Sequence, residues 1–366
     1  LSQKREEDGE VRVMFYQCPK CKQHWQYPIE KCPNCFLNLE KIASKKIKVI
    51  GVSRVTIPTI LHPKVPYFVL VLEDDKGNRW IEKSFEGYKI GDEFKIEKSK
   101  DKSTVAILRV KYDIVSTVEE IIRLTGEIKI NSETKILILP TLLSPQHPYL
   151  AVNTNPKVLD SLIKYLIANG GKSQNIKVVA QSFGEVPIET SALKSQLLDV
   201  CLQNKITPLD LAKSHFLKKE KEEFSFEISE EVFNNDIIIN LPILKLDSKF
   251  KVRGSLENTL KFLKKESYLS LKYLRDDFEI IEKLQEIMPK YLTIADANVV
   301  QKTTGHTSFV GLILASFSPF NLDRVFAEIA MIKDLPSYLS RINIQDIPII
   351  GRKIKEVQYD IERVGT

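Results

Sequence analysis

The sequence contains little cysteine, methionine or tryptophan, and it has no long apolar run. Its 366 residues include five cysteines, three methionines and two tryptophans. No apolar run approaches the roughly 20 residues that a membrane-spanning helix needs, so we expect no membrane segment. Residues 1–8 are polar and charged, which argues against a signal peptide. We therefore expect a cytoplasmic protein, and the length predicts two or three globular domains.

Four of the five cysteines form two Cys-x-x-Cys pairs, Cys18 with Cys21 and Cys32 with Cys35. Two such pairs complete the tetrahedral thiolate set that zinc prefers and leave no open coordination position, so we predict one structural zinc ion. This arrangement indicates a metal site in a reducing compartment rather than a disulfide framework. Only Cys201 remains, and we expect no iron–sulfur cluster because a cluster needs about four thiolates.

Residues 46–112 alternate short strand-like runs with turns, which predicts a small five-stranded β-barrel of the OB type. The expected strands cover residues 46–57, 67–72, 79–85, 93–97 and 104–110. The net charge of +6 belongs to this end of the chain: residues 1–113 hold 22 Lys and Arg against 16 Asp and Glu, and the rest holds 32 of each. This excess suits a polyanion or a phosphorylated cofactor, or it serves solubility alone; both interpretations stay open.

The segment with the two cysteine pairs and the predicted barrel together resemble the domain-of-unknown-function family number thirty-five, found beside thiolases and related acyl-CoA enzymes. The resemblance rests on the two cysteine pairs, Gly51–Thr56, Val65–Tyr67 and Ile90–Asp92. It implies a rubredoxin-like zinc ribbon followed by an OB-fold barrel. It also implies a scaffold that docks on a thiolase-type enzyme and helps to seat coenzyme A.

A zinc ribbon joined to an OB barrel is also common in nucleic-acid-binding proteins, and this is the alternative interpretation. The aromatic residues available for stacking on bases are Trp25, Tyr27, Tyr67 and Trp80, although alternate placement in strands favours core positions for most of them. The acidic hairpin at Glu73–Asp75 would repel a polyanion. We therefore rank nucleic acid below an acyl-CoA enzyme as the partner.

Beyond residue 130 the pattern changes to alternating strands and helices. This predicts an α/β domain with a mostly parallel sheet and helices on both faces. We expect strands at 135–139, 176–180, 223–228, 236–240, 291–295 and 310–315. We expect helices starting at 155 and covering about 189–204, 207–214, 255–265, 267–288 and 319–332.

Ligands of such sheets bind at the carboxyl ends of the strands. The loops expected there are 140–154, 181–189, 241–254, 296–308 and 316–321, and they are rich in polar residues. From these loops and the helices beside them we select five candidate ligand-binding residues for a small anion: Asn240, Lys245, Asn258, Asp296 and Asp323. Ordinary solvated loops and helix caps would contain the same residue types, so that interpretation stays open as well.

The second half of the chain resembles the domain-of-unknown-function family number three hundred and sixty-two over about residues 133–360. The matching stretches are Asp236–Lys245, Asn258, Thr293–Asp296 and Gly311–Ser316 followed by Asp323. The sequence departs from the family in three places. Asp247 and Glu257 replace a usual His and Lys, and Leu139-Pro140-Thr141 replaces a usual Lys-Pro-Asn.

The predicted domains are a tail (1–15), a zinc ribbon (16–43), an OB-fold barrel (44–113), a connector (114–130) and an α/β domain (131–366). We expect the α/β domain to fold by itself from about residue 128. No nucleophile–base pair is evident, so no catalytic residue is predicted. The predicted function is a non-catalytic accessory protein of acyl-CoA metabolism that docks a thiolase-type enzyme and coenzyme A and binds a small anionic ligand or a second partner.

Overall fold

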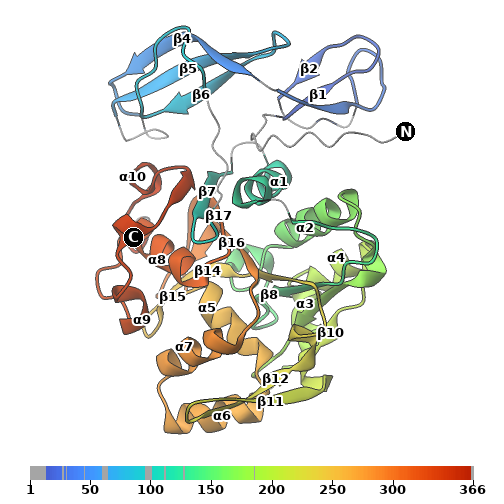
Figure 1. Cartoon of the computed structure of the whole chain (residues 1–366), viewed down its shortest axis with the longest axis vertical. Coiled ribbons are helices and arrows are strands. Elements are labelled where there is room, and N and C mark those ends of the chain that lie inside the picture. Colours follow the sequence, from blue (N-terminus) through green and yellow to red (C-terminus); the bar gives the residue numbers. More distant parts are fainter. Residues whose placement is uncertain are drawn as a thin grey trace. The chain divides into compact units, whose positions relative to one another are not determined.

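The computed structural model describes residues 14–26, 29, 31–44, 46–59, 65–94, 101–110, 113–126, 128–184 and 186–363. The chain divides into two compact units, Leu1–Lys98 and Ser99–Thr366 (Figure 1). Small antiparallel sheets make up the first unit, and the second is an α/β unit built on one large sheet. The prediction of a multidomain chain with a mostly parallel sheet in its larger part is therefore confirmed.

A three-stranded antiparallel sheet carries the cysteine pairs in the first unit. Its strands are β1 (Met14–Gln17), β2 (His24–Trp25) and β3 (Glu40–Ala43), with β1 in the middle. The first cysteine pair lies in the turn between β1 and β2, where Gln17 pairs with His24. The second pair lies inside a bridge between Lys31 and Asn38.

A second antiparallel sheet follows, made of β4 (Ile47–Val55), β5 (Tyr67–Asp74) and β6 (Arg79–Ser84). Alternate residues of its strands point into a small core, as a half-buried sheet requires. This core consists of Phe15, Ile47, Val49, Leu70, Leu72 and Trp80. Phe15 comes from β1 and meets Trp80 edge-on, with 5.2 Å between ring centroids. The two small sheets therefore share one core.

The predicted OB barrel is corrected at its last strand. Residues 104–110 do form a strand, β7 (Val105–Arg109), but it pairs with strands of the large sheet. The predicted strand at 93–97 extends past the described residues, and its described part makes one bridge, Glu93 with Lys48. Tyr27, named above as a possible stacking residue, lies outside the described residues. Closure of an OB barrel remains a prediction.

The large sheet has the strand order β10-β9-β8-β13-β16-β17-β7-β18, with β14 and β15 attached beside β16. The strands β10, β9, β8, β13 and β16 run parallel to one another. The strand direction reverses at β17, which is antiparallel to both β16 and β7. The bounds are β8 (Ile136–Pro140), β9 (Ile176–Ala180), β10 (Leu209–Asp210), β13 (Ile237–Leu241), β14 (Ile243–Asp247), β15 (Lys251–Arg253), β16 (Leu292–Gln301), β17 (Thr307–Ser316) and β18 (Ile349–Gly351). Every residue of β8 is buried, because the sheet is covered on both faces there.

The longer helices of this unit are α1 (Ile114–Thr125), α2 (Pro156–Ala168), α6 (Lys265–Leu274), α7 (Asp277–Ile287) and α8 (Pro319–Ile329). The shorter ones are α3 (Ile188–Lys194), α4 (Leu197–Gln203), α5 (Ser255–Asn258), α9 (Ser337–Ser340) and α10 (Ile354–Val357). None of the helices in the described part of the chain is long and apolar enough to cross a bilayer.

The predicted connector at 114–130, within which a helix is expected at 116–124, contains α1. This helix packs against β7, β17 and α2, and its side chains Val118, Ile121 and Ile122 are fully buried. Asp113 caps its first turn by accepting a hydrogen bond from the Ser116 N–H, at 2.6 Å. These residues therefore belong to the α/β unit rather than to a linker.

Further elements differ from the prediction. The expected helix at 189–204 is broken between α3 and α4, and the one at 255–265 is α5 followed by the 3₁₀ helix at Thr259–Phe262. The expected helix at 207–214 consists of β10 and a single 3₁₀ turn, Leu211–Lys213. The expected helix at 267–288 is broken between α6 and α7, where Asp276 caps α7 by accepting from the Phe278 N–H. Apolar periodicity alone does not detect such a break, because the helical spacing of apolar residues continues across it.

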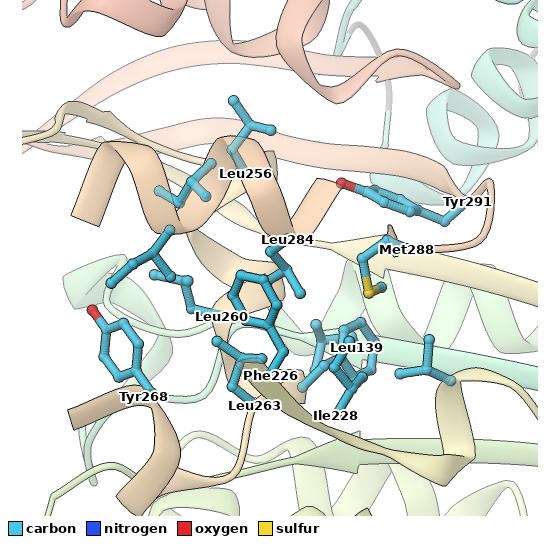
Figure 2. Packing of buried hydrophobic residues seen from close by; sticks show 14 of the residues in the cluster. Leu139, Phe226, Ile228, Leu256, Leu260, Leu263, Tyr268, Leu284, Met288 and Tyr291 are labelled. Atoms are coloured by element: carbon cyan, nitrogen blue, oxygen red, sulfur yellow. The ribbon is translucent and has the colours of Figure 1, made fainter. Parts of the chain in front are cut away.

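One face of the large sheet is covered by a long apolar core. Figure 2 shows side chains of this core converging from β8, from α7 and from β12 (Phe224–Ser229) of the hairpin that β12 forms with β11 (Phe216–Lys221). Leu256 on α5 and Leu260 on the following 3₁₀ helix η5 (Thr259–Phe262) also enter it. This packing fixes α5 and η5 against the sheet, which places their polar side chains for the site described below.

Candidate functional site

Cys18, Cys21, Cys32 and Cys35 come together in the first unit. Each can offer its Sγ atom as a ligand, and the four Sγ atoms lie within 4.8 Å of one another. The two turns have the same backbone geometry. Cys18 N–H donates to the Gln23 carbonyl at 2.8 Å, and Cys32 N–H donates to the Leu37 carbonyl at 2.9 Å. No other group of three or more metal-ligating side chains gathers within the described ranges.

This cluster fits a tetrahedral metal ion. A zinc ion with Zn–S bonds of about 2.3 Å holds its sulfur ligands about 3.8 Å apart, and the Cys21 and Cys32 Sγ atoms are 3.6 Å apart. Burial by itself would raise the pKa of the Cys18 thiol. Hydrogen bonds, chiefly from the backbone N–H groups of Cys21 and Lys20, outweigh this effect and lower the pKa to about 7. The four predicted ligands therefore form a group that can hold a metal ion.

In the α/β unit, Asn240 and Asn258 belong to one buried hydrogen-bond network. Asn258 donates to the Asn240 Oδ1 at 2.8 Å, and Asn240 donates to the Ser255 carbonyl at 2.7 Å. Thr141 donates to the Asn258 Oδ1 at 3.0 Å. All four residues are at most 3% exposed. This network connects α5 to the ends of β8 and β13. Both amide side chains therefore hydrogen-bond to groups of the protein itself.

Asp323, on α8, holds the amino end of α5. Its two carboxylate oxygens accept hydrogen bonds from the backbone N–H groups of Ser255, at 2.8 Å, and Leu256, at 2.9 Å. Burial raises the pKa of Asp323 to about 7, against the lowering effect of those two hydrogen bonds. Gly254 allows this approach, because a Cβ there would lie 2.5 Å from the Asp323 Oδ1 and 2.8 Å from a Leu244 methyl carbon.

Replacing Gly254 with alanine should therefore destabilise the α/β unit by about 1–3 kcal/mol, as overpacking of a filled core does. Both neighbours of the new methyl group, Asp323 and Leu244, are buried and have no room to retreat. Gly184→Ala is the matched control, since its Cβ would meet nothing closer than 3.8 Å. Urea unfolding followed by circular dichroism measures both; equal midpoints for the two variants would contradict the close approach.

Asp296 lies within β16 rather than in a loop, and it is 1% exposed. It accepts a hydrogen bond from the Asn298 N–H at 2.9 Å. Burial raises the pKa of Asp296 to about 6, although hydrogen bonds from the backbone N–H groups of Asn298 and Asn155 lower it. Asn155 also caps α2, so Asp296 links β16 to the start of that helix.

Lys245 lies on β14, within a segment expected to be a loop, and only 4% of it is exposed. Its Nζ donates to the Val152 carbonyl at 2.7 Å. Directly opposite it, on the antiparallel strand β15, stands Arg253. Burial lowers the pKa of Lys245 to about 7, and the positive charges of Arg253 and Lys261 contribute in the same direction, against the carboxylates of Glu257 and Asp247.

Arg253 and Lys261 were not among the predicted site residues. Arg253 donates to the Glu257 carboxylate at 2.5 Å, and Lys261 follows one turn after Glu257, on η5. The Lys261 Nζ lies 3.9 Å from the centroid of the Phe183 ring. Arg253 lies four residues before Glu257 and Lys261 four residues after it, a spacing that indicates ion pairs along a helix. Only the fold brings Lys245 and Phe183 close to these residues.

The five predicted residues thus fall into two groups. Asn240, Asn258 and Asp323 hold α5 on the sheet, and Lys245 and Asp296 flank the loop that contains Val152 and Asn155. One expected loop is at the wrong edge: because β17 is antiparallel to β16, Ser316 pairs with Thr293 at the amino end of β16, so 316–321 lies away from the other loops. The expected loop at 296–308 is instead the β16–β17 hairpin.

Solved structures and a family of sequences are similar to parts of this chain. On its N-terminal region it is similar to an Ltp2–ChsH2(DUF35) aldolase structure, with 19% identity, a TM-score of 0.20 and coverage of 24% of this chain and 75% of that one. A DUF35 protein of unknown function from Sulfolobus solfataricus is 16% identical there, with a TM-score of 0.19 and coverage of 23% and 67%.

The lactate racemase apoprotein from Thermoanaerobacterium thermosaccharolyticum is 12% identical, with a TM-score of 0.41, and the similarity covers 63% of this chain and 58% of the racemase. No functionally curated protein matches the chain. The domain of unknown function DUF362 matches residues 136–328, which confirms the resemblance to that family expected from the sequence. Because this match spans more than half of the 366 residues, the chain belongs to the DUF362 family.

Proposed function

We propose that this protein is a non-catalytic accessory protein of acyl-CoA metabolism. In this proposal the first unit holds one structural zinc ion through Cys18, Cys21, Cys32 and Cys35 and docks a thiolase-type enzyme together with coenzyme A. The observation that carries the proposal is the closed cysteine cluster in a unit whose two small sheets share one core. A closed cluster leaves no coordination position for chemistry, as expected of a scaffold.

The outer face of the β4-β5-β6 sheet supports docking. Val71 on β5 pairs with Ile81 on β6, so the two side chains lie next to each other on the face opposite the core residues Leu70 and Leu72. Ile81 is 64% exposed. An apolar pair on the solvent face of a small sheet is the kind of contact that a protein partner buries.

The nucleic-acid alternative has less support. Tyr67 and Trp80 are buried, at 7% and 6% exposure, so neither offers a free ring face for a base. The acidic hairpin does not help to decide, however. Asp74 is buried and closes its own turn, accepting hydrogen bonds from the Asn78 N–H and from Ser44, each at 2.7 Å. Glu73 is paired with Arg79.

For the α/β unit we propose a small anionic ligand near the carboxyl ends of the parallel strands. Of the five candidate residues, we assign direct contact with the ligand to Lys245, because it is the only cation among them. Asn240, Asn258, Asp296 and Asp323 then act by holding the segments around it. Support comes from the burial of Lys245 among other cations, which a bound anion would offset.

The test is affinity purification of the full chain from its native host, with identification of partners by mass spectrometry. We expect a thiolase-type enzyme, and Ile81→Arg should reduce its recovery at least tenfold without loss of zinc. Leu274→Arg is the matched control, since Leu274 is 74% exposed on α6 of the other unit. Full-chain binding of coenzyme A and single-stranded RNA is then measured at two salt concentrations. Submicromolar RNA binding at physiological salt, with no response to coenzyme A and no thiolase recovered, would instead support the alternative.

A further inference from the structure

Three cations from three different elements influence one another electrostatically in the α/β unit. Lys245 comes from β14, Arg253 from β15 and Lys261 from η5. They are close enough for Arg253 and Lys261 to depress the pKa of Lys245, and for Arg253 to depress that of Lys261. Like charges placed opposite each other on paired strands, as Lys245 and Arg253 are, destabilise a sheet. The fold therefore keeps a repulsive arrangement at this position.

Two carboxylates face these cations, and they do not use all the donors. Glu257 binds Arg253 through one guanidinium nitrogen at 2.5 Å, and Asp247 lies 4.0 Å from another. The Arg253 Nε is buried and has no hydrogen-bond partner. A buried donor without a partner is unfavourable, so a ligand that accepts a hydrogen bond from it would remove that penalty.

Lys261 is the second donor without a partner. It is 9% exposed, and in the described part of the chain its Nζ has no hydrogen bond and no ion pair, only the ring contact with Phe183. A hydrogen bond to its backbone holds Lys261 in this position. Gln181, 1% exposed, donates to the carbonyls of both Lys261 and Leu263 at 2.8 Å, which fastens η5 to the end of β9. Phe183 in turn stacks on Tyr268, with 5.2 Å between centroids.

From this geometry we propose that Lys245, Arg253 and Lys261 form a binding site for an oxyanion, a carboxylate or phosphate group of a small metabolite. The Arg253 guanidinium supplies a planar donor pair and the two ammonium groups supply point charges, which together suit such a group. The side chains of Arg253 and Asp247 are 29% and 25% exposed, so the cluster is open to solvent on that side. This deepens the anion-binding part of the proposed function and is independent of docking by the first unit.

The site should lose affinity as the pH rises. Lys245 and Lys261 have pKa values lowered to about 7 and about 8, chiefly by burial. Glu257 opposes the lowering at both lysines and Asp247 at Lys245, while Arg253 reinforces it at both and Lys265 at Lys261. An oxyanion binds the protonated lysines, so both must carry a proton. Binding should therefore weaken between pH 6 and pH 9 as these protons are lost.

The probe is sodium sulfate, whose charge stays constant over this pH range, titrated into the zinc-loaded full chain at ionic strength held constant with chloride. Calorimetry and the shift of the thermal unfolding midpoint report binding. We expect saturable binding at pH 6 that weakens at least tenfold by pH 9. Sodium phosphate and sodium acetate, titrated at pH 6, then distinguish the two oxyanion classes.

Lys261→Met should weaken sulfate binding at pH 6 at least tenfold. Lys264→Met is the matched control, because Lys264 lies three residues away but pairs with Glu227 at 3.0 Å, and its affinity should stay within twofold of the parent. Should Lys261→Met not fold, the wild-type pH profile still decides. Sulfate binding that is equal in both variants, or that does not change with pH, would overturn this site while leaving the docking proposal untouched. If no thiolase partner were recovered while sulfate binding stayed intact, the docking proposal would fall and this site would stand.

Discussion

Replacing Cys32 with serine should abolish zinc binding and unfold the first unit while the α/β unit stays folded. Cys32 is fully buried in the cysteine cluster, and its Sγ lies 3.6 Å from that of Cys21. Metal binding contributes roughly 10–16 kcal/mol to the folding of small zinc-bound units. The core that the structure describes in the first unit, six buried residues and their partly buried neighbours, is too small to replace that contribution. The loss should reach the β4-β5-β6 sheet as well, because Phe15 joins both sheets in one core.

The two tryptophans make this measurement selective. Trp25 and Trp80 are the only tryptophans in the sequence, and both belong to the first unit. Tryptophan emission should therefore shift to the red in Cys32→Ser, while the circular dichroism of the helices of the α/β unit persists. Metal analysis should fall from close to one zinc per chain to near zero. Cys201→Ala is the control, since Cys201 is a buried core residue of α4 and should leave the zinc content unchanged. Finding iron, or full zinc in Cys32→Ser, would refute the site.

The second large effect concerns where the α/β unit begins. A fragment of residues 99–366 should fold without zinc, whereas a fragment of residues 128–366 should be unfolded or aggregated. The shorter fragment lacks β7, which lies between β17 and β18, and α1, which covers part of the same sheet. The fully buried side chains removed are Val105, Ala106, Ile107, Val118, Ile121 and Ile122. At roughly 1.5–3 kcal/mol for each large apolar side chain, their loss is comparable to the whole stability of a typical domain, about 5–15 kcal/mol.

Both fragments are compared by size-exclusion chromatography and urea unfolding, followed by circular dichroism. The fragment of residues 99–366 should elute as a compact species and unfold cooperatively. Deleting β7 also leaves the edges of β17 and β18 without their partner, and such edges promote aggregation. If residues 128–366 gave the same midpoint as residues 99–366, then β7 and α1 would not be part of the fold, and the boundary expected from the sequence would stand.

The sequence determined the parts of this protein that depend on neighbouring residues. The cysteine cluster is one, because a Cys-x-x-Cys turn aims two sulfurs at one point whatever surrounds it. The strand at Ile176–Ala180 is another, since a short β-branched run between a helix and a turn has few alternatives. The helix from Pro156, with its Asn155 cap, is a third. Such local rules also established the alternation that predicts an α/β fold.

The tertiary structure alone decided which sheet each strand joins and which side chains meet. The strand at 105–109 follows the barrel segment in sequence, yet it pairs with β17, about two hundred residues away. Its pattern is that of any buried strand, so nothing local names its partner. The same holds for the cation cluster: Lys245 was selected from the sequence, but Arg253 faces it only because β14 and β15 pair in that register. Phe183 reaches Lys261 only because Gln181 fastens η5 to the end of β9. Pairing and packing over long separations are cooperative properties of the whole unit, and a single sequence read locally does not contain them.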